Sequence, residues 1–212
     1  MGTDKMAKGL FITFEGCDGM GKSTQVGLVA EILRKLGYNV LTSREPGGTS
    51  LAETVRSIVL NPDLPLNNVT QTLLFLAARS EHVEKVLRPA KESGKIVLCD
   101  RFSDSTIAYQ GYAQEKSEAE IDSLKQQNAF ATGNFVPDLT LLFDADPKEI
   151  LVRRNARADN DRFENAGLEF QYKLRNGFLK LAQEEPERFI IVDALQEKNT
   201  VTEFIVKSIL DI

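Results

Sequence analysis

Residues 16–23 read GCDGMGKS and fit the pattern G-x-x-x-x-G-K-S/T, whose residue types suit the binding of a phosphate chain. The glycines let the backbone turn without a Cβ clash, so that successive N–H groups can surround one anion. Lys22 can then lie across the outer phosphates, and the Ser23 hydroxyl can help to hold a Mg²⁺ ion that bridges two of them. The spacing predicts an ATP-phosphate loop made of Gly16, Cys17, Asp18, Gly19, Met20, Gly21, Lys22, Ser23 and Thr24.

The chain on either side of this loop has the character that such a site requires. The apolar run at residues 10–14 predicts a buried strand, and a helix is expected to begin at Lys22 and to stop at Gly37. A strand, a glycine-rich turn and a helix N-terminus would aim several N–H groups at one anion. This context favours a phosphate loop over its alternative, a glycine-rich turn with a surface lysine. One face of the helix would carry Val26, Val29, Leu33 and Leu36.

Basic residues gather at predicted strand ends and loops. A kinase whose acceptor is itself a phosphate must overcome the repulsion between two polyanions, and arginine suits this because its planar fork grips two phosphate oxygens. Such an acceptor is already ionised near neutral pH, so it needs no general base, unlike a serine or sugar hydroxyl. The candidate cations are Lys22, Arg44, Arg101 and the group Arg153, Arg154, Arg157 and Arg162. That last group suits a flap that closes over the donor, with a solvated helix end as the alternative.

Composition limits the class of protein. At 212 residues, with a net charge of −5 and 42% hydrophobic residues, the chain fits one globular domain. No window approaches the ~18 apolar residues of a membrane span, and the acidic balance argues against a broad nucleic-acid-binding face. We expect residues 1–8 to be a loose leader before a single domain at residues 9–212.

The two cysteines and the single histidine are not expected to do chemistry. Cys17 and Cys99 should stay reduced, which indicates a cytoplasmic protein, and no histidine is placed in the sequence to activate Cys17 as a nucleophile. His82 should be a surface or helix-packing residue without a catalytic role.

Strand and helix patterns alternate along the chain. Strands are predicted at residues 10–14, 39–42, 95–99, 139–143 and 189–192, and helices at 22–36, 50–60, 70–93, 118–131, 148–156, 166–184 and 201–210. Pro89 should kink or divide the third of these helices. This order predicts a doubly wound α/β fold of five parallel strands flanked by helices. Asp100 and Arg101 directly follow the strand at 95–99, at the edge where such sheets bind their ligands.

Residues 98–110, LCDRFSDSTIAYQ, closely resemble the signature of thymidylate kinases, the enzymes that convert dTMP to dTDP. Residues 44–49 (REPGGT), 74–79 (LFLAAR) and 161–164 (DRFE) are similar to that family's second loop, its base-binding helix and part of its lid. The similarity runs from about Gly9 to the last helix. It implies a fold of the P-loop NTPase kind, ATP with Mg²⁺ as phosphoryl donor, a homodimer, and a lid at about residues 153–165.

The resemblance implies roles for residues around the acceptor base. Phe75 would stack on the thymine ring, and Arg79 would donate to a carbonyl at its edge. Thr106 and Gln110, with Ser105 nearby, would read the remaining polar edge. For Phe75 the alternative is an ordinary core residue, because its helical spacing fits that as well.

The same resemblance implies which residues would contact the sugar and the acceptor phosphate. Asp18 would hold the deoxyribose 3′-hydroxyl, while Tyr109 would crowd the 2′ position and disfavour ribose. Arg44 and Arg101 would grip the phosphate, and Asp100 would help to place Mg²⁺ through water. An Asp100–Arg101 ion pair is the alternative for the last two residues.

One position departs from part of the family. Some members carry a basic residue where this chain has Gly19, so the loop here lacks a cation on the transferring phosphate. The resemblance is closest to the bacterial type, in which a lid arginine supplies that charge. Arg157 is the best positional match and Arg153 the next.

These inferences converge on the transfer of the γ-phosphoryl group of ATP to dTMP, giving dTDP and ADP for dTTP synthesis. Two alternatives stay open. One is a kinase for another nucleoside monophosphate or for a deoxynucleoside, and the other is a nucleotide-binding scaffold that has lost catalysis.

Overall fold

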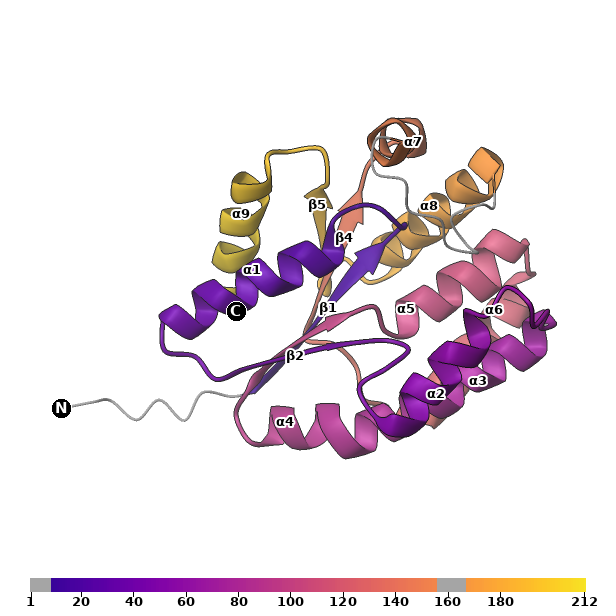
Figure 1. Cartoon of the computed structure of the whole chain (residues 1–212), viewed down its shortest axis with the longest axis horizontal. Coiled ribbons are helices and arrows are strands. Elements are labelled where there is room, and N and C mark those ends of the chain that lie inside the picture. Colours follow the sequence, from indigo (N-terminus) through magenta and orange to yellow (C-terminus); the bar gives the residue numbers. More distant parts are fainter. Residues whose placement is uncertain (1–8, 156–166) are drawn as a thin grey trace.

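The computed structural model of the chain describes residues 9–155 and 167–212, with side chains at 9–151 and 167–212. Five parallel strands form one sheet in the order β2-β3-β1-β4-β5, at the centre of the molecule in Figure 1. The predicted doubly wound fold with five parallel strands is confirmed. The strands are β1 (Leu10–Gly16), β2 (Val40–Arg44), β3 (Ile96–Asp100), β4 (Leu139–Asp144) and β5 (Phe189–Asp193).

Helices cover both faces of this sheet (Figure 1). On one face, α1 (Lys22–Lys35) packs beside α9 (Lys198–Leu210). On the other face, strands contact α4 (Arg88–Glu92), α5 (Ser103–Thr106) and α8 (Gly167–Glu184). Farther from the sheet, α2 (Ser50–Val59) packs on α3 (Asn68–His82), α3 on α6 (Glu118–Thr132), and α7 (Pro147–Asn155) on α8.

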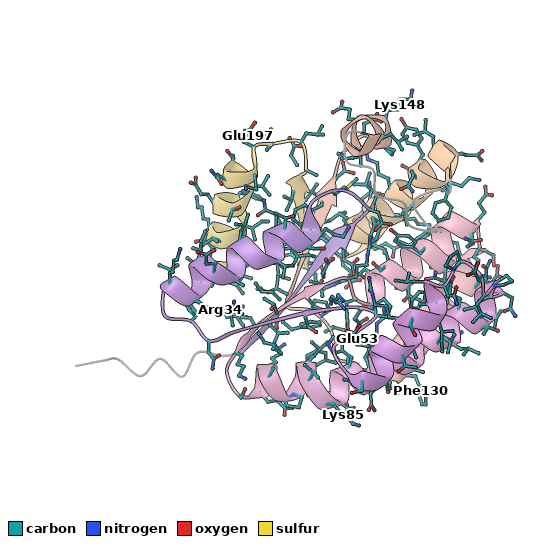
Figure 2. All side chains as sticks on the ribbon, viewed as in Figure 1. Arg34, Glu53, Lys85, Phe130, Lys148 and Glu197 are labelled. Atoms are coloured by element: carbon teal, nitrogen blue, oxygen red, sulfur yellow. The ribbon has the colours of Figure 1, made fainter. Side chains whose placement is uncertain are left out.

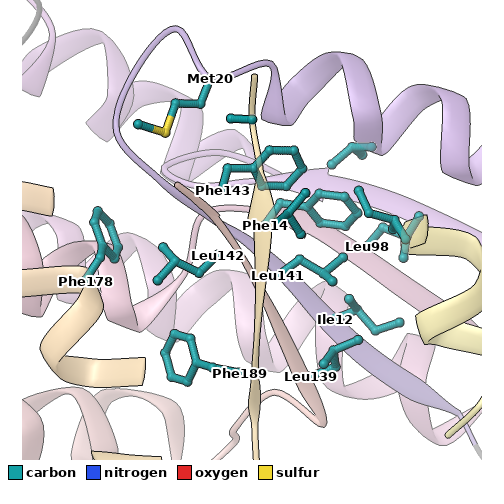
Figure 3. Packing of buried hydrophobic residues seen from close by; sticks show 14 of the residues in the cluster. Ile12, Phe14, Met20, Leu98, Leu139, Leu141, Leu142, Phe143, Phe178 and Phe189 are labelled. Carbon is teal, nitrogen blue, oxygen red and sulfur yellow. The ribbon is translucent and has the colours of Figure 1, made fainter. Parts of the chain in front are cut away.

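The core lies on both faces of the central strands, because successive side chains of a strand point to opposite sides. Ile12 of β1 belongs to the larger buried cluster, with Leu33 of α1, and Figure 3 shows part of this cluster. Phe11 belongs to a second cluster with Leu87 and Phe135, and its ring stacks on that of Phe135 at a centroid distance of 4.8 Å. A strand buried on both faces explains the continuous apolar run that predicts β1.

The helix predicted at residues 70–93 is divided earlier than expected. It begins at Asn68 behind an Asn67 cap and ends at His82, where a π-helical turn, Val83–Leu87, joins it to α4. Pro89 lies in the first turn of α4 and has no N–H to donate backwards. The predicted division is therefore present, but it begins as a wider π-helical turn at Val83, ahead of the proline.

The sequence patterns do not predict the helical stretch at residues 103–114. It consists of α5, a π-helical turn at Ile107–Gly111 and a 3₁₀ turn at Tyr112–Gln114. The first turn is made of Ser, Asp and Thr residues, which are weak helix formers, so burial against the sheet and α8 has to stabilise it. Within the described residues, no helix is long and apolar enough to cross a membrane.

Candidate active site

The loop at residues 16–23 joins β1 to α1 at the carboxyl edge of the sheet, and its glycines have the backbone angles that the turn needs. Gly16, Gly19 and Gly21 have φ values of +127°, +81° and +87°. A Cβ on Gly16 would also lie 2.3 Å from the carbonyl oxygen of Phe143 on the neighbouring strand β4. Only glycine fits both this angle and this close approach, so the first loop glycine is required by the sheet itself.

Lys22, the first residue of α1, lies over the loop. Its Nζ donates to the carbonyl oxygens of Gly16 at 3.1 Å and Cys17 at 2.6 Å, and its side chain is buried. Burial, and then repulsion from Arg101, lowers the pKa of Lys22. The cation is thus held beside the backbone turn, within reach of a phosphate chain that the turn would bind.

Cys17 is a packing residue of this loop. Its thiol is buried, and burial raises its pKa to about 12, so it carries no thiolate near neutral pH. Cys99 in β3 is also buried and free, with a raised pKa.

Two oxygen groups meet beside Lys22. The Ser23 hydroxyl, in the first turn of α1, donates a hydrogen bond to Oδ2 of Asp100 at the end of β3. Within the described residues no group of three His, Cys, Asp or Glu side chains could hold a metal ion by itself. A hydroxyl with one carboxylate nevertheless fits Mg²⁺, because this ion takes hard oxygen ligands and keeps several waters or substrate phosphates.

Arg101 links the loop to the segment after β3. Its guanidinium donates to Asp18 at 2.5 Å, to the Tyr109 hydroxyl at 3.1 Å and to the Ser105 hydroxyl at 2.9 Å. The Tyr109 hydroxyl in turn donates to the second Asp18 oxygen at 2.6 Å. Within the described chain, Arg101 forms its salt bridge with Asp18 and none with Asp100.

The Asp18 carboxylate is held ionised in this group. Burial works to raise its pKa, but the charges of Arg101 and Lys22 and the hydrogen bond from Tyr109 outweigh burial, so the pKa lies well below its usual range. Asp18 is therefore an anionic acceptor at physiological pH, suited to a hydroxyl donor.

A second buried arginine, Arg79 of α3, is surrounded by acceptors. Its Nε donates to Glu45 at 2.7 Å, and its Nη1 donates to Thr106 at 2.8 Å and Asn128 at 2.5 Å. Its Nη2 donates one N–H to the Phe102 carbonyl oxygen at 3.0 Å. Within the described residues, one of its five N–H groups, on Nη2, has no hydrogen-bond partner, and the guanidinium lines a hollow.

His82 supports the other side of Glu45. Its Nδ1 lies 3.0 Å from Oε1 of Glu45 and its Nε2 lies 2.7 Å from the Ser43 hydroxyl. The ring is fully buried, so His82 is a helix-packing residue and not a surface one. Arg79 and His82 together lower the pKa of Glu45 against the effect of its burial.

Between α2, α3 and α5 lies an open hollow of about 710 Å³, measured out to its mouth. It joins residues from distant parts of the sequence, and its walls are both aromatic and charged. The predicted acceptor residues that line it are Asp18, Phe75, Arg79, Arg101, Ser105, Thr106, Tyr109 and Gln110.

Other residues of this hollow were not predicted as site residues from sequence. Arg56, from α2, donates to the Pro46 carbonyl oxygen at 3.1 Å. The sequence offers only a weak signal for Arg56, because the same helix also carries Glu53 and several Ser and Thr residues. The additional lining residues are Glu45, Pro46, Arg56, Leu60 and Phe102.

Arg44 lies in an adjoining groove instead. It is exposed and donates to both carboxylate oxygens of Glu53, at 3.2 and 3.1 Å; Figure 2 labels Glu53. Ser23, Asp100 and Arg56 line the same groove, so Arg44 shares a groove with the Ser23–Asp100 pair and does not line the hollow. Arg157 lies outside the described residues, as do residues 1–8 and 156–166, and the Arg153 side chain is also outside them.

The comparisons with known proteins agree on one family. The family model described as thymidylate kinase matches residues 14–205. A thymidylate kinase of Geobacillus sp. is 42% identical over 96% of this chain and 97% of its own, and one of Pseudomonas fluorescens is 49% identical over 89% of each. The crystal structure of thymidylate kinase from Ehrlichia chaffeensis has a TM-score of 0.75 and 36% identity, and it covers 94% of this chain and 98% of its own. The chain therefore belongs to the thymidylate kinase family.

Proposed function

We propose that this protein transfers the γ-phosphoryl group of ATP to dTMP, giving dTDP and ADP for dTTP synthesis. One observation carries the proposal, the Arg101–Asp18 contact, which joins the phosphate loop to the hollow. A donor in the loop and an acceptor in the hollow would then meet at Arg101. Bringing two polyanions together requires a cation at that point.

The donor side uses the loop and Lys22. The N–H groups of residues 16–23 would receive the inner phosphates, and Lys22 would exchange the Gly16 and Cys17 carbonyl oxygens for phosphate oxygens. Lys22 would then stabilise the charge that develops on the transferring group.

The acceptor side follows from the walls of the hollow. Phe75 would stack on thymine, and the remaining Nη2 N–H of Arg79 would donate to a base carbonyl. Thr106 and Gln110 would read the rest of the base edge, with Ser105 beside them. Phe75 is also partly buried against the cluster that contains Ala78, so the same side chain would pack in the core and form a wall of the proposed site.

Sugar and phosphate would lie nearer the loop. The Asp18 carboxylate would accept from the 3′-hydroxyl, and Tyr109 would leave no room for a 2′-hydroxyl. Arg101 in the hollow and Arg44 in the adjoining groove would hold the acceptor phosphate between them. The phosphate is already ionised, so no side chain has to remove a proton.

We also propose Mg²⁺ as the metal, with Ser23 and Asp100 as the residues that hold it, directly or through water. When bound, Mg²⁺ offsets the charge on the donor phosphates. The remaining charge on the transferring group would come from the lid, with Arg157 first and Arg153 second, because Gly19 provides none.

A homodimer and a cytoplasmic location complete the proposal. Apolar side chains are exposed on adjacent helices, Val69 and Leu73 on α3 and Phe130 on α6, and a second copy would cover them. Both cysteines are free, as in a reducing compartment.

The test is ADP release by the purified chain with ATP, Mg²⁺ and one acceptor at a time, among dTMP, dUMP, UMP, CMP and thymidine. We expect the highest kcat/KM with dTMP, weak use of UMP and none of thymidine, which lacks the acceptor phosphate. A preference for another monophosphate would support that kinase class instead, and no turnover with any acceptor would support a scaffold.

A matched pair of variants links the activity to the loop. Lys22→Met at the start of α1 should lower kcat by roughly 10² or more. Lys35→Met, at the exposed end of the same helix where the side chain pairs with Glu31, should leave it unchanged. Equal activity of the two variants would contradict the role given to Lys22.

A further inference from the structure

Glu15, next to the end of β1, is a fully buried carboxyl group that the proposed reaction does not use. Its Oε1 accepts the backbone N–H of Phe102 at 2.7 Å and that of Ser105 at 3.4 Å. Its Oε2 accepts the Ser105 hydroxyl at 2.6 Å. One side chain of β1 therefore binds a backbone segment that lies about 90 positions farther along the chain.

The segment that Glu15 binds is the one that presents Arg101. Arg101 has φ +72°, a left-handed conformation that a residue with a side chain adopts rarely and that its surroundings must hold in place. Its own N–H donates to the Phe14 carbonyl oxygen at 3.0 Å. On the far side, the Ser105 hydroxyl accepts from Nη1 of Arg101 at 2.9 Å while it donates to Glu15.

We propose that Glu15 is a positioning residue for the acceptor site. Its carboxylate fixes the turn at Phe102 and the direction of the Ser105 hydroxyl, and through that hydroxyl it aims the Arg101 guanidinium at the hollow. Glu15 does not line the hollow and would touch no substrate. The inference rests on the proposed function, since it takes the hollow to be the dTMP site.

The titratable groups around Glu15 come from β3, α5 and the turn between them. Asp104 of α5 raises the Glu15 pKa, Arg101 lowers it, and the Cys99 thiol on β3 is also close. Burial has the largest effect, and together these raise the pKa of Glu15 from 4.5 to about 7. Asp104 is itself paired with Arg188, at 2.8 and 3.0 Å. Glu15 therefore changes charge near neutral pH, within the range where activity can be measured.

A carboxylate performs this task better than an amide of the same shape. A glutamine at position 15 could still accept the Phe102 N–H, but its NH₂ group would point a donor at the Ser105 hydroxyl. That oxygen already accepts from Arg101, so the hydroxyl proton would have to point elsewhere. The charge-assisted bonds would also be lost, and these are about twice as strong as neutral ones.

The experiment compares the intact chain with Glu15→Gln by steady-state kinetics. We expect the KM for dTMP to rise about tenfold and the KM for ATP to change by less than about twofold. The control is Glu31→Gln on the exposed face of α1, which should change neither. A rise in both KM values to the same degree, or an unchanged KM for dTMP, would overturn the proposal.

The pH profile separates positioning from a purely structural role. The ratio of kcat/KM for dTMP between the wild type and Glu15→Gln cancels the titration of the dTMP phosphate, which both enzymes share. This ratio should fall toward one below about pH 6, where Glu15 is mostly protonated, and approach its full value above about pH 8. A ratio that is constant with pH contradicts the inference.

If Glu15→Gln does not fold, the wild type provides a second measurement. Thymidine 5′-sulfate keeps an anionic group for Arg101 to hold, and that group does not titrate in this range. Its affinity, measured by calorimetry, should fall several-fold from about pH 8 to about pH 6. Constant affinity would overturn the positioning role. Wild type that turns over no dTMP at any pH would instead contradict the proposed function, so the two failures are distinguishable.

Discussion

Two carboxyl groups near the end of β1 have pKa values that move in opposite directions. Burial and Asp104 raise the pKa of Glu15 to about 7, whereas for Asp18 the charges of Arg101 and Lys22 outweigh burial and lower it. One strand and its loop thus place an acid that titrates near neutrality three residues before one that stays ionised. The difference arises from neighbours, since Asp18 has a direct arginine partner and Glu15 does not.

This difference predicts how stability depends on pH. Between the unfolded value near 4.5 and the folded value near 7, the native protein holds a proton on Glu15 that the unfolded chain has lost. The free energy of unfolding from this group therefore falls as pH rises through that window, by about 3 kcal/mol, and levels off above it. Asp18 acts in the opposite direction at lower pH, because its stabilisation is present above its ordinary pKa and is lost on further acidification.

Urea unfolding at several pH values measures this effect. The free energy of unfolding of Glu15→Gln minus that of the wild type should rise steadily from about pH 5 to about pH 7.5. The lost hydrogen bonds shift this difference by a constant amount and do not change its slope. Glu31→Gln is the exposed control, for which the same difference should stay constant over this range of pH. Parallel curves for the wild type and Glu15→Gln would contradict the raised pKa.

At the scale of elements, α5 is held against the sheet by a buried ion pair. Asp104 accepts both Nη groups of Arg188, which lies directly before β5, and Arg188 also donates to Thr140 of β4 at 2.6 Å. Thr140 in turn lies 2.9 Å from the Thr13 hydroxyl on β1. Three neighbouring strands and one short helix are joined in this way below the acceptor hollow.

Breaking this pair from one side should be costly. Arg188→Met leaves the Asp104 carboxylate buried without its cation, and we expect a loss of about 3–5 kcal/mol in the free energy of unfolding. The double variant with Asp104→Asn removes both charges and should recover part of that loss. Denaturant titration of the four proteins in this cycle gives the coupling, and a double variant as unstable as the sum of the single ones would show that the pair is not coupled.

The elements differ in how far sequence predicts them. The five strands are predicted because each is a short apolar run, and α1 because Gly37 ends a clear helical face. The helical stretch at 103–114 is not, because its first turn is polar and it depends on Arg188 and α8, far along the chain. For the same reason, the sequence does not reveal the role of Glu15. It is one polar residue in an apolar strand, and its partner Phe102 lies 87 residues away.

At the scale of the whole molecule, α3 has two different faces. Its inner face carries Phe75 and Arg79 into the hollow, whereas Val69 and Leu73 on its outer face are 67% and 57% exposed. Phe130 on the neighbouring helix α6 is 90% exposed, and Figure 2 labels it at the rim of the molecule. A second copy that covers these three side chains would brace the helix that forms one wall of the acceptor site.

This arrangement predicts that subunit number and dTMP binding change together. The wild type should have about twice the 23.6 kDa mass of one chain in solution, and the double variant Leu73→Glu and Phe130→Glu should have the mass of one. The variant should also bind dTMP more weakly, because α3 loses its outer support while the ATP loop keeps its own. Light scattering after size-exclusion chromatography measures the mass, and the KM for each substrate measures the effect on the two sites.

The control is Phe204→Glu on α9, which is 45% exposed on the far side of the sheet and should remain a dimer with an unchanged KM. A wild type with the mass of one chain, or a monomeric variant with an unchanged KM for dTMP, would show that α3 is positioned by its own subunit alone.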